Sequence, residues 1–306
     1  EQRRTRRTVL VAGGANVFVG AVKLAAGIMS GSSAMLAEAA HSVADTLNQA
    51  FLLTSLHRGA RSPDARHPFG YGQERYFWSL LSAFGIFIAG AGFSVFEGLL
   101  SLTRDRSAST GTGTIVAFAA LGLAGIAEGT SLARALWQVR HAARARGAGV
   151  ASQLRDGPDT TVKTAVFEDA TAVIGLVIAA FGLIMRVVTR SGVWDGAASI
   201  AIGALLVVVA VRLGLDSRDY LIGRSASPEE ISAITDEIGN APGVDALLDL
   251  RTLRLGPDQM VIAARVAFSD RISADQAEDV ADAIDRRLSE RLPVAMHVFL
   301  DPTQAG

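Results

Sequence analysis

The sequence predicts an α-helical membrane protein, a bundle of six transmembrane helices followed by a small cytoplasmic α+β domain. Half of the 306 residues are hydrophobic and only 19% are charged, with a mean hydropathy of +0.33, which is typical of proteins that reside in the lipid bilayer. Six apolar stretches are long enough to cross a hydrocarbon core, which needs about 20 residues. After residue 215 the apolar runs end and a charged, alternating pattern begins.

The six predicted spans make up the first domain, residues 1–215. They lie near residues 8–29, 33–56, 77–102, 112–138, 161–186 and 193–214. The four residues SGSS at 30–33 predict a tight turn between the first two spans, and two further loops, 104–113 and 190–196, are short. The remaining two loops are longer and basic.

The basic residues predict how the chain is oriented. They gather before the first span and in the second and fourth loops: Arg3, Arg4, Arg6, Arg7; Arg58, Arg61, Arg66, Arg75; Arg140, Arg144, Arg146, Arg155 and Lys163. The alternate loops carry two basic residues at most, so the positive-inside rule places both termini in the cytoplasm. The preference for arginine over lysine favours a prokaryotic source, and hence the inner (plasma) membrane.

Residues 216–226 are predicted to be a linker, and residues 227–306 a separate domain. Ser227, Pro228 and Glu230 have the spacing of a helix start with a capping box. Two alternating stretches follow, joined at 256–258, and then an amphipathic helix capped by Ser273 and a closing strand. This order of helix, strand, strand, helix, strand indicates a small soluble α+β domain.

The composition also limits the chemistry. The chain has no cysteine, so it can form neither a disulfide nor a thiolate metal site, and a metal must be held by His, Asp, Glu or backbone oxygens. The net charge of −1 gives no sign of a nucleic-acid partner, and we expect none. We expect no organic cofactor either.

Two of the spans contain the residues that point to a metal. His41 and Asp45 lie four residues apart in the second span, on one helix face. Asn48 follows one turn later on the same side, and Glu168 and Asp169 interrupt the fifth span. Ionisable groups at this depth are costly and serve a pathway in most cases. Two helices that contribute an imidazole and carboxylates could form a tetrahedral site for zinc or a neighbouring first-row ion.

The alternative is that these polar residues only hydrogen-bond their neighbours. We weigh this reading lower because no lysine or arginine within a span is evident that would neutralise the carboxylates. An intramembrane hydrolase is the other class of function considered. It would need a motif such as HExxH or a serine with its base, and the sequence offers neither.

In these spans the sequence resembles the cation diffusion facilitators, and within that family the zinc transporter 9 branch. The stretch SGSSAMLAEAAHSVADTLNQ is similar to the family's second span, HPFGYGQERY at 67–76 to its third-span entry, and FEDATAVIG to the fifth span of that branch. The resemblance implies an exporter of divalent metal, Zn²⁺ first and Fe²⁺, Mn²⁺ or Co²⁺ as alternatives, that exchanges the metal for protons by alternating access. It also implies a homodimer with a ferredoxin-like cytoplasmic domain.

One departure from the family pattern affects the site. The family's usual fifth-span histidine falls at Ala165, whereas its aspartate is Asp169. Glu168 shares the helix face and could fill the vacant ligand position, and Glu128 of the fourth span is a further candidate. An oxygen-rich site is harder than the usual one, which shifts its preference toward iron, manganese or cobalt. Loss of the histidine also leaves open a membrane metal sensor that does not transport.

Two other groups resemble secondary metal positions of the family and are weaker. Asp64 and His67 lie in the second loop, but Tyr71 occupies the position of a further histidine there, so we favour a structural role. His297 and Asp301 lie on the last predicted strand. Since no other histidine belongs to that domain, we do not expect a binuclear regulatory site.

Overall fold

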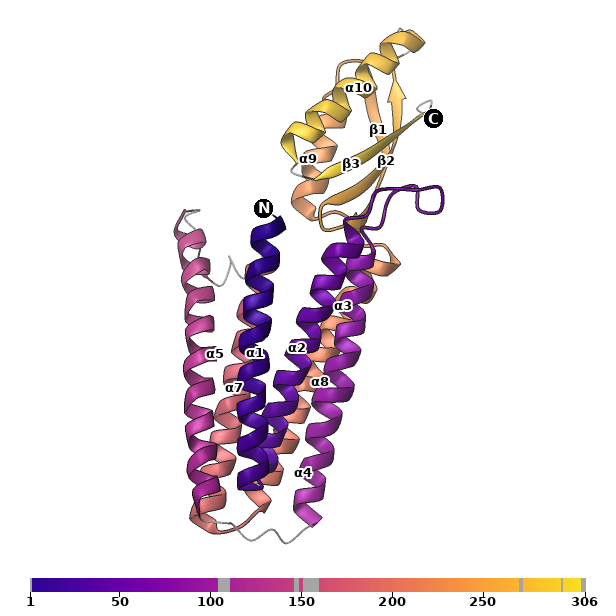
Figure 1. Ribbon diagram of the computed structural model, residues 1–306. Coiled ribbons are helices and arrows are strands. Elements are labelled where there is room, and N and C mark those ends of the chain that lie inside the picture. The colour runs from indigo at the N-terminus through magenta and orange to yellow at the C-terminus, as the bar shows by residue number, and fades with distance from the viewer. Residues whose placement is uncertain are drawn as a thin grey trace. The chain divides into compact units, whose positions relative to one another are not determined.

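The computed structural model describes residues 2–103, 111–145, 149–150, 160–269, 272–292 and 294–303. Residues 104–110 of the predicted loop 104–113 and the basic residues Arg146 and Arg155 lie outside them. The chain forms two compact units, residues 1–50 with 82–212, and residues 51–81 with 213–306. Figure 1 shows long helices in the first unit and a small sheet with two helices in the second.

Eight helical elements are described before residue 223: α1 (Gln2–Ser30), α2 (Ser33–Gly59), α3 (Glu74–Gly85), the π-helix η1 (Ile86–Gly92), α4 (Phe93–Thr103), α5 (Thr112–Ala145), α7 (Thr160–Thr189) and α8 (Val193–Ile222). Because α3, η1 and α4 are continuous, they make six long helical segments, and the segment ends fall close to the predicted spans. The sequence pattern did not predict the π-helix, whose wider turns need an extra residue within the helix.

Four of these segments are long and apolar enough to cross a membrane: Glu74–Thr103, Thr112–His141, Val166–Thr189 and Val193–Ile222. Within its described part, α1 contributes a shorter apolar stretch, Asn16–Ser30. Helix α2, which carries the predicted metal ligands, does not meet the same criterion. The helical membrane architecture is therefore confirmed, whereas the count of six spans stays a prediction.

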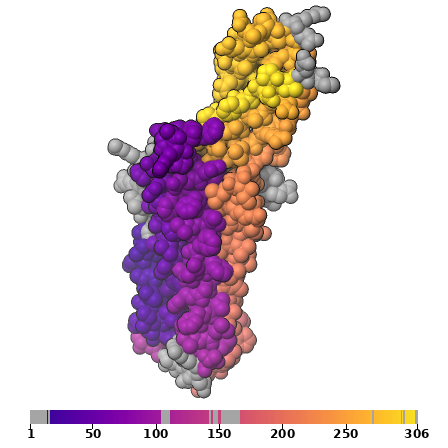
Figure 2. Space-filling view, turned by 90° about the vertical axis from the view of Figure 1, so that its right-hand side faces the viewer, coloured from indigo at the N-terminus to yellow at the C-terminus, as the bar shows by residue number. Residues whose placement is uncertain are grey.

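Helices α4 and α8 pack at backbone distance, and Figure 2 shows them side by side on one face of the first unit. A Cβ atom at Gly98 would lie 2.8 Å from the carbonyl oxygen of Gly196, and one at Gly196 would lie 3.0 Å from the carbonyl oxygen of Gly98. Any side chain at either position would force the helices apart. The two glycines therefore allow close contact over the α4–α8 seam.

The turn between α1 and α2 is fastened to the start of α8 by a buried carboxylate. Asp195 accepts hydrogen bonds from the Ser32 hydroxyl and the Ser33 amide, both at 2.6 Å. The Arg186 guanidinium lies 3.4 Å from the same carboxylate and also donates to the Gly31 carbonyl. The ends of α1 and α7 and the starts of α2 and α8 therefore meet at one end of the bundle.

The second unit contains the α+β domain. Its elements are α9 (Pro228–Gly239), β1 (Val244–Gly256), β2 (Gln259–Phe268), α10 (Ala274–Arg291) and β3 (Ala295–Pro302). The strand order is β1-β2-β3, with β1 antiparallel and β3 parallel to β2. The predicted capping boxes at Ser227 and Ser273 are both formed. The core consists of apolar side chains of the two helices and the central strand: Ile234, Ile238, Met260, Ile262, Ile284 and Leu288.

The second unit also includes the loop between α2 and α3, which packs against the sheet. A Cβ atom at Gly72 would lie 2.6 Å from the carbonyl oxygen of Leu255, so only glycine fits there. The Phe69 ring meets the His297 ring edge to face at a centroid distance of 5.2 Å. Helix α8 continues to Ile222, through residues assigned to the linker, and the domain limits at 215 and 227 stay a prediction.

Candidate metal-binding site

Helix α2 places the predicted histidine and aspartate inside the bundle. The alanine-rich stretch around them favours a helix, and the spacing of four residues stacks the two side chains. His41 Nε2 lies 3.6 Å from Asp45 Oδ2, too far for a hydrogen bond. His41 is 6% exposed, and neither ring nitrogen has a hydrogen-bond partner among the described residues. A buried imidazole with unused nitrogen atoms is available as a metal ligand.

Glu168 on α7 is held by a short chain of hydrogen bonds. The Asn48 side-chain nitrogen donates to Glu168 Oε1 at 3.0 Å, and the Ser82 hydroxyl donates to Asn48 Oδ1 at 2.6 Å. This chain links α7, α2 and α3. In this arrangement Asn48 orients Glu168, and its role as a direct metal ligand stays a prediction.

Asp169, the neighbour of Glu168, is oriented from α5. The Ser131 hydroxyl donates to Asp169 Oδ2 at 2.7 Å. The serine hydroxyl therefore points across to α7 and not along its own helix.

The predicted ligands are gathered but do not form a closed site. The Glu168 carboxylate interacts electrostatically with Asp45 and with Asp169, and Asp45 also interacts with Asp169. Within the described parts of the chain, however, no three His, Asp or Glu side chains are grouped closely enough to hold a metal ion. Carboxylates that face one another without a cation between them repel. Drawing them together therefore requires a bound cation or protons.

Comparison with known proteins places this chain in a family. The model of the cation efflux transmembrane domain matches residues 9–222, and that of the cation efflux protein cytoplasmic domain matches residues 226–302. This chain belongs to the cation efflux family. Its members are transporters and not enzymes, as the sequence predicted.

Relatives of this cation efflux chain come from animals, plants and bacteria. It is 34% identical over 250 residues to the mitochondrial proton-coupled zinc antiporter SLC30A9 of Xenopus laevis, covering 82% of this chain and 44% of the relative. It is 34% identical over 270 residues to metal tolerance protein C4 of Arabidopsis thaliana, covering 88% and 58%. It is 26% identical over 279 residues to the cation-efflux pump FieF of Pectobacterium atrosepticum, covering 90% and 85%. The chain thus spans about half the length of the first two.

The sequence reading missed a cation inside the bundle of this cation efflux protein. Lys23 of α1 is fully buried, and its ammonium lies 3.0 Å from Glu38 Oε2 of α2 and 4.0 Å from Glu128 Oε1 of α5. Lys23 pairs with Glu38 and Glu128, and among the described residues it forms no ion pair with Asp45, Glu168 or Asp169, so it does not neutralise the predicted ligands. Glu128 faces this ammonium at 4.0 Å, which partly neutralises its carboxylate, and its role as a metal ligand stays a prediction. The signal in the sequence was a single lysine in an apolar run, which costs energy unless it is paired.

The loop residues Asp64 and His67 form a hydrogen-bonded turn in this structure. Asp64 accepts hydrogen bonds from the Tyr71 hydroxyl at 2.6 Å and from the amides of Arg66 and His67. The Tyr71 hydrogen bond, followed by those from the backbone, holds the pKa of Asp64 below its usual value. The same contact raises the pKa of Tyr71. Tyr71 thus occupies the carboxylate that a metal would need, which favours the structural role.

In the α+β domain, the two residues named as a weaker possibility are engaged separately. His297 packs against Phe69, and Asp301 accepts a hydrogen bond from Arg265 at 3.1 Å. The side chains are used for packing and for an ion pair on the sheet. The expected absence of a binuclear site stays a prediction.

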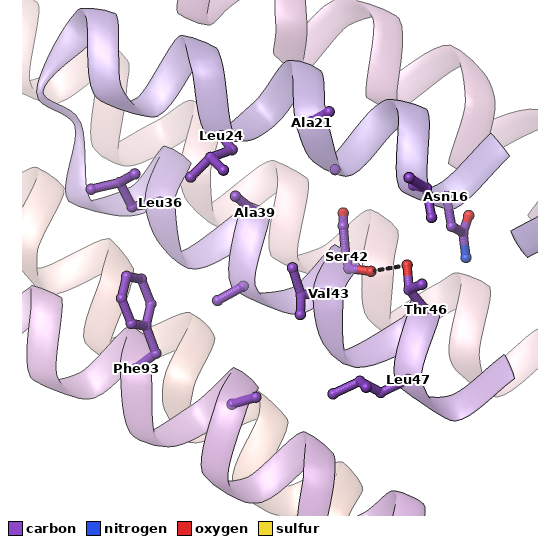
Figure 3. A pocket seen from close by; sticks show the side chains of 14 residues that line it. Asn16, Ala21, Leu24, Leu36, Ala39, Ser42, Val43, Thr46, Leu47 and Phe93 are labelled. Atoms are coloured by element: carbon purple, nitrogen blue, oxygen red, sulfur yellow. Dashed lines mark hydrogen bonds between the residues drawn. The ribbon is translucent and has the colours of Figure 1, made fainter. Parts of the chain in front are cut away.

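A groove of about 470 Å³ lies on another face of α2. Figure 3 shows it between α1, α2 and the third long segment, with Val43, Leu47 and Phe93 among the side chains that line it. None of its lining residues is titratable. It therefore lacks the imidazole and carboxylate ligands of the predicted site, which lies on the side of α2 that carries His41 and Asp45.

Proposed function

We propose that this cation efflux protein exports a divalent transition-metal ion, Zn²⁺ in first place, and that His41, Asp45, Glu168 and Asp169 bind it. The observation that carries the proposal is a buried imidazole without a hydrogen-bond partner, in a helix whose next turn faces two carboxylates of α7. The donor set of one nitrogen and several oxygens suits Zn²⁺ and also Fe²⁺, Mn²⁺ and Co²⁺. Relatives that are named as zinc antiporters and cation-efflux pumps support the same substrate class.

The side chains provide a mechanism based on alternating access. His41 can bind metal only when it is neutral, and the carboxylates bind when ionised. Glu168 takes the ligand position that Ala165 leaves vacant, with Asn48 fixing its orientation. Protons on the far side of the membrane compete for the same atoms and release the metal. The protonated site then returns, which makes the cycle a metal/proton antiport.

The setting of the transporter is part of the proposal. A multi-pass membrane protein is supported by the apolar helices and by the family. We place both termini in the cytoplasm, because basic residues gather on that side of the predicted spans, and the protein in a prokaryotic inner membrane. A homodimer is proposed on the resemblance to the family.

The test measures metal uptake by the full chain in proteoliposomes, with and without a pH gradient. Asp45→Ala and Asp169→Asn each remove a ligand and should slow Zn²⁺ uptake by about tenfold or more. Glu168→Gln should have the same effect if Glu168 binds the metal. Asp64→Ala in the loop is the matched control and should transport normally. A panel of Zn²⁺, Fe²⁺, Mn²⁺ and Co²⁺ with each variant identifies the cargo.

The outcomes separate the alternatives. A metal-uptake rate that changes neither with the pH gradient nor with Asp45→Ala would refute the transport role of this site. Metal binding without flux would favour the sensor that does not transport. Flux that requires the ligands but not the gradient would leave the exporter in place and remove the proton exchange.

A further inference from the structure

The buried pair of Lys23 and Glu38 is a feature that metal binding does not use. Both side chains are 0% exposed, and Lys23 Nζ donates to Glu38 Oε2 at 3.0 Å. The pair joins α1 to α2, and the Glu128 carboxylate of α5 lies on the other side of the ammonium at 4.0 Å. One ion pair therefore ties three helices of the bundle together at a single level.

The level of the pair lies between the metal ligands and the α1–α2 turn. Glu38 precedes Asp45 by seven residues in α2, so it lies roughly 10 Å nearer to that turn. Side-chain exposure falls along this direction: Asp45 is 29% exposed, His41 7%, and Glu38 and Lys23 0%. The ligands are thus partly accessible, while access beyond them ends at the ion pair.

Helix α7 completes the closure at the same level. A Cβ atom at Gly175 would lie 2.5 Å from Glu38 Oε1, so the carboxylate presses against the α7 backbone. Gly175 lies seven residues after Glu168, two turns along the same helix face. Four helices, α1, α2, α5 and α7, therefore meet around the pair.

The pair is only partly satisfied. Glu38 Oε1 is buried and has no hydrogen-bond partner in the described residues. A buried carboxylate oxygen without a partner is costly, so the pair stabilises this conformation less than a fully hydrogen-bonded pair would. A contact that forms in one conformation and separates in another must not be too stable.

We propose that the Lys23–Glu38 pair is the closed gate on the α1–α2 turn side of the metal site. The inference rests on the proposed transport function, because a gate has a role only if the cargo passes through. When the pair separates, the route from His41 and Asp45 to the α1–α2 turn opens. The Lys23 ammonium also repels a metal ion, so the cargo cannot pass while the ammonium holds its place.

The absence of cysteine makes the gate directly testable with single introduced thiols. Ala179 is 0% exposed and follows Gly175 by one turn of α7, on the side of the α1–α2 turn. We would replace Ala179→Cys in the full chain, purify it in detergent, and measure its rate of modification by a charged maleimide. Ser191→Cys, in the loop before α8, is the reference for a thiol that the reagent reaches regardless of the gate.

Removing both charges while keeping the side-chain volumes, Lys23→Met with Glu38→Gln, should raise the modification rate at position 179 by about tenfold, as expected for a shift in the open population. The charge exchange Lys23→Glu with Glu38→Lys restores a pair and should keep the rate close to that of the parent. The rate at position 191 should be the same in all three backgrounds. Size-exclusion profiles and thermal unfolding establish that each protein is folded.

An unchanged rate at position 179 in the folded neutral variant would overturn the gate. So would an equal rise in the charge exchange, because pairing would then be irrelevant. Failure of the gate and failure of the transport function are distinguishable. If Asp45→Ala abolishes uptake while the thiol rates do not change, transport through the site stands and the gate falls. If the rates of thiol modification change as expected while Asp45→Ala leaves the metal-uptake rate unchanged, the proposed transport function is refuted.

Discussion

The ion pair of Lys23 and Glu38 also leads to a prediction about stability. In Lys23→Met the ammonium is lost, and Glu38, which is fully buried, keeps a negative charge with no partner. Breaking a buried ion pair from one side costs about 3–5 kcal/mol, and the full burial of both side chains puts this site at the upper end. Adding Glu38→Gln removes the stranded charge, so the double variant should regain all but about 1 kcal/mol.

Tryptophan fluorescence during denaturant titration of the detergent-solubilised chain measures this effect. Trp78, Trp137 and Trp194 are the three tryptophans of the chain, and all lie in helices before residue 223. Trp137 and Trp194 belong to the first unit and report on its helices, whereas Trp78 belongs to the second unit, so Trp78→Phe in every variant restricts the signal to the first unit. A loss below about 1 kcal/mol in Lys23→Met would refute the reasoning, as would a double variant no more stable than the single one.

Three further predictions concern the second unit. Gly72→Ala places a Cβ atom 2.6 Å from the Leu255 carbonyl oxygen, so the loop should separate from the sheet and become open to proteolysis. Tyr71→Phe removes the strongest hydrogen bond to Asp64, and the lowered pKa of that carboxyl should rise toward 3.8 in a carbon-detected NMR titration. Ser227→Ala removes the side-chain cap of α9 and should destabilise the helix by about 1 kcal/mol, measured by hydrogen exchange.

A control, a pH dependence or a contradicting outcome tests each of these predictions. Gly239→Ala adds a Cβ atom with no other atom within 4 Å, so its proteolysis should match the parent, and equal cutting of both variants would contradict the packing argument. The loop should keep its turn above the pKa of Asp64 and lose it as the pH falls through that value, because a lowered folded pKa stabilises the ionised state. Hydrogen-exchange rates in α9 that do not change in Ser227→Ala would show that the cap does not stabilise the helix.

Much of the fold could be predicted because it depends on local patterns. The ends of the helices follow apolar runs and turn residues, and both capping boxes follow from a serine and a side chain three residues later. The pairing of His41 with Asp45 follows from their spacing of four residues. These features need only neighbours along the chain.

The contacts that the sequence did not reveal join distant segments. Lys23 meets Glu38 across the α1–α2 turn, Ser131 turns to Asp169 on α7, and Asn48 binds Glu168. In each case the partner depends on which helix faces which, and that is decided by packing and not by periodicity. The cation that pairs with Glu38 and faces Glu128 was for the same reason not evident from the sequence pattern.

The glycine seam between α4 and α8 has a consequence for how the bundle can move. Gly98 and Gly196 let the backbones of α4 and α8 touch. If one helix slid along the other by a single residue, a side chain would meet a carbonyl oxygen, because the side chains of Val95 and Ile200 already lie close to the contact. Such a close-packed contact resists sliding of one helix along the other. During any rearrangement that carries an ion across the membrane, α4 and α8 should therefore stay together as one rigid body, while α1, α2, α5 and α7 shift relative to it.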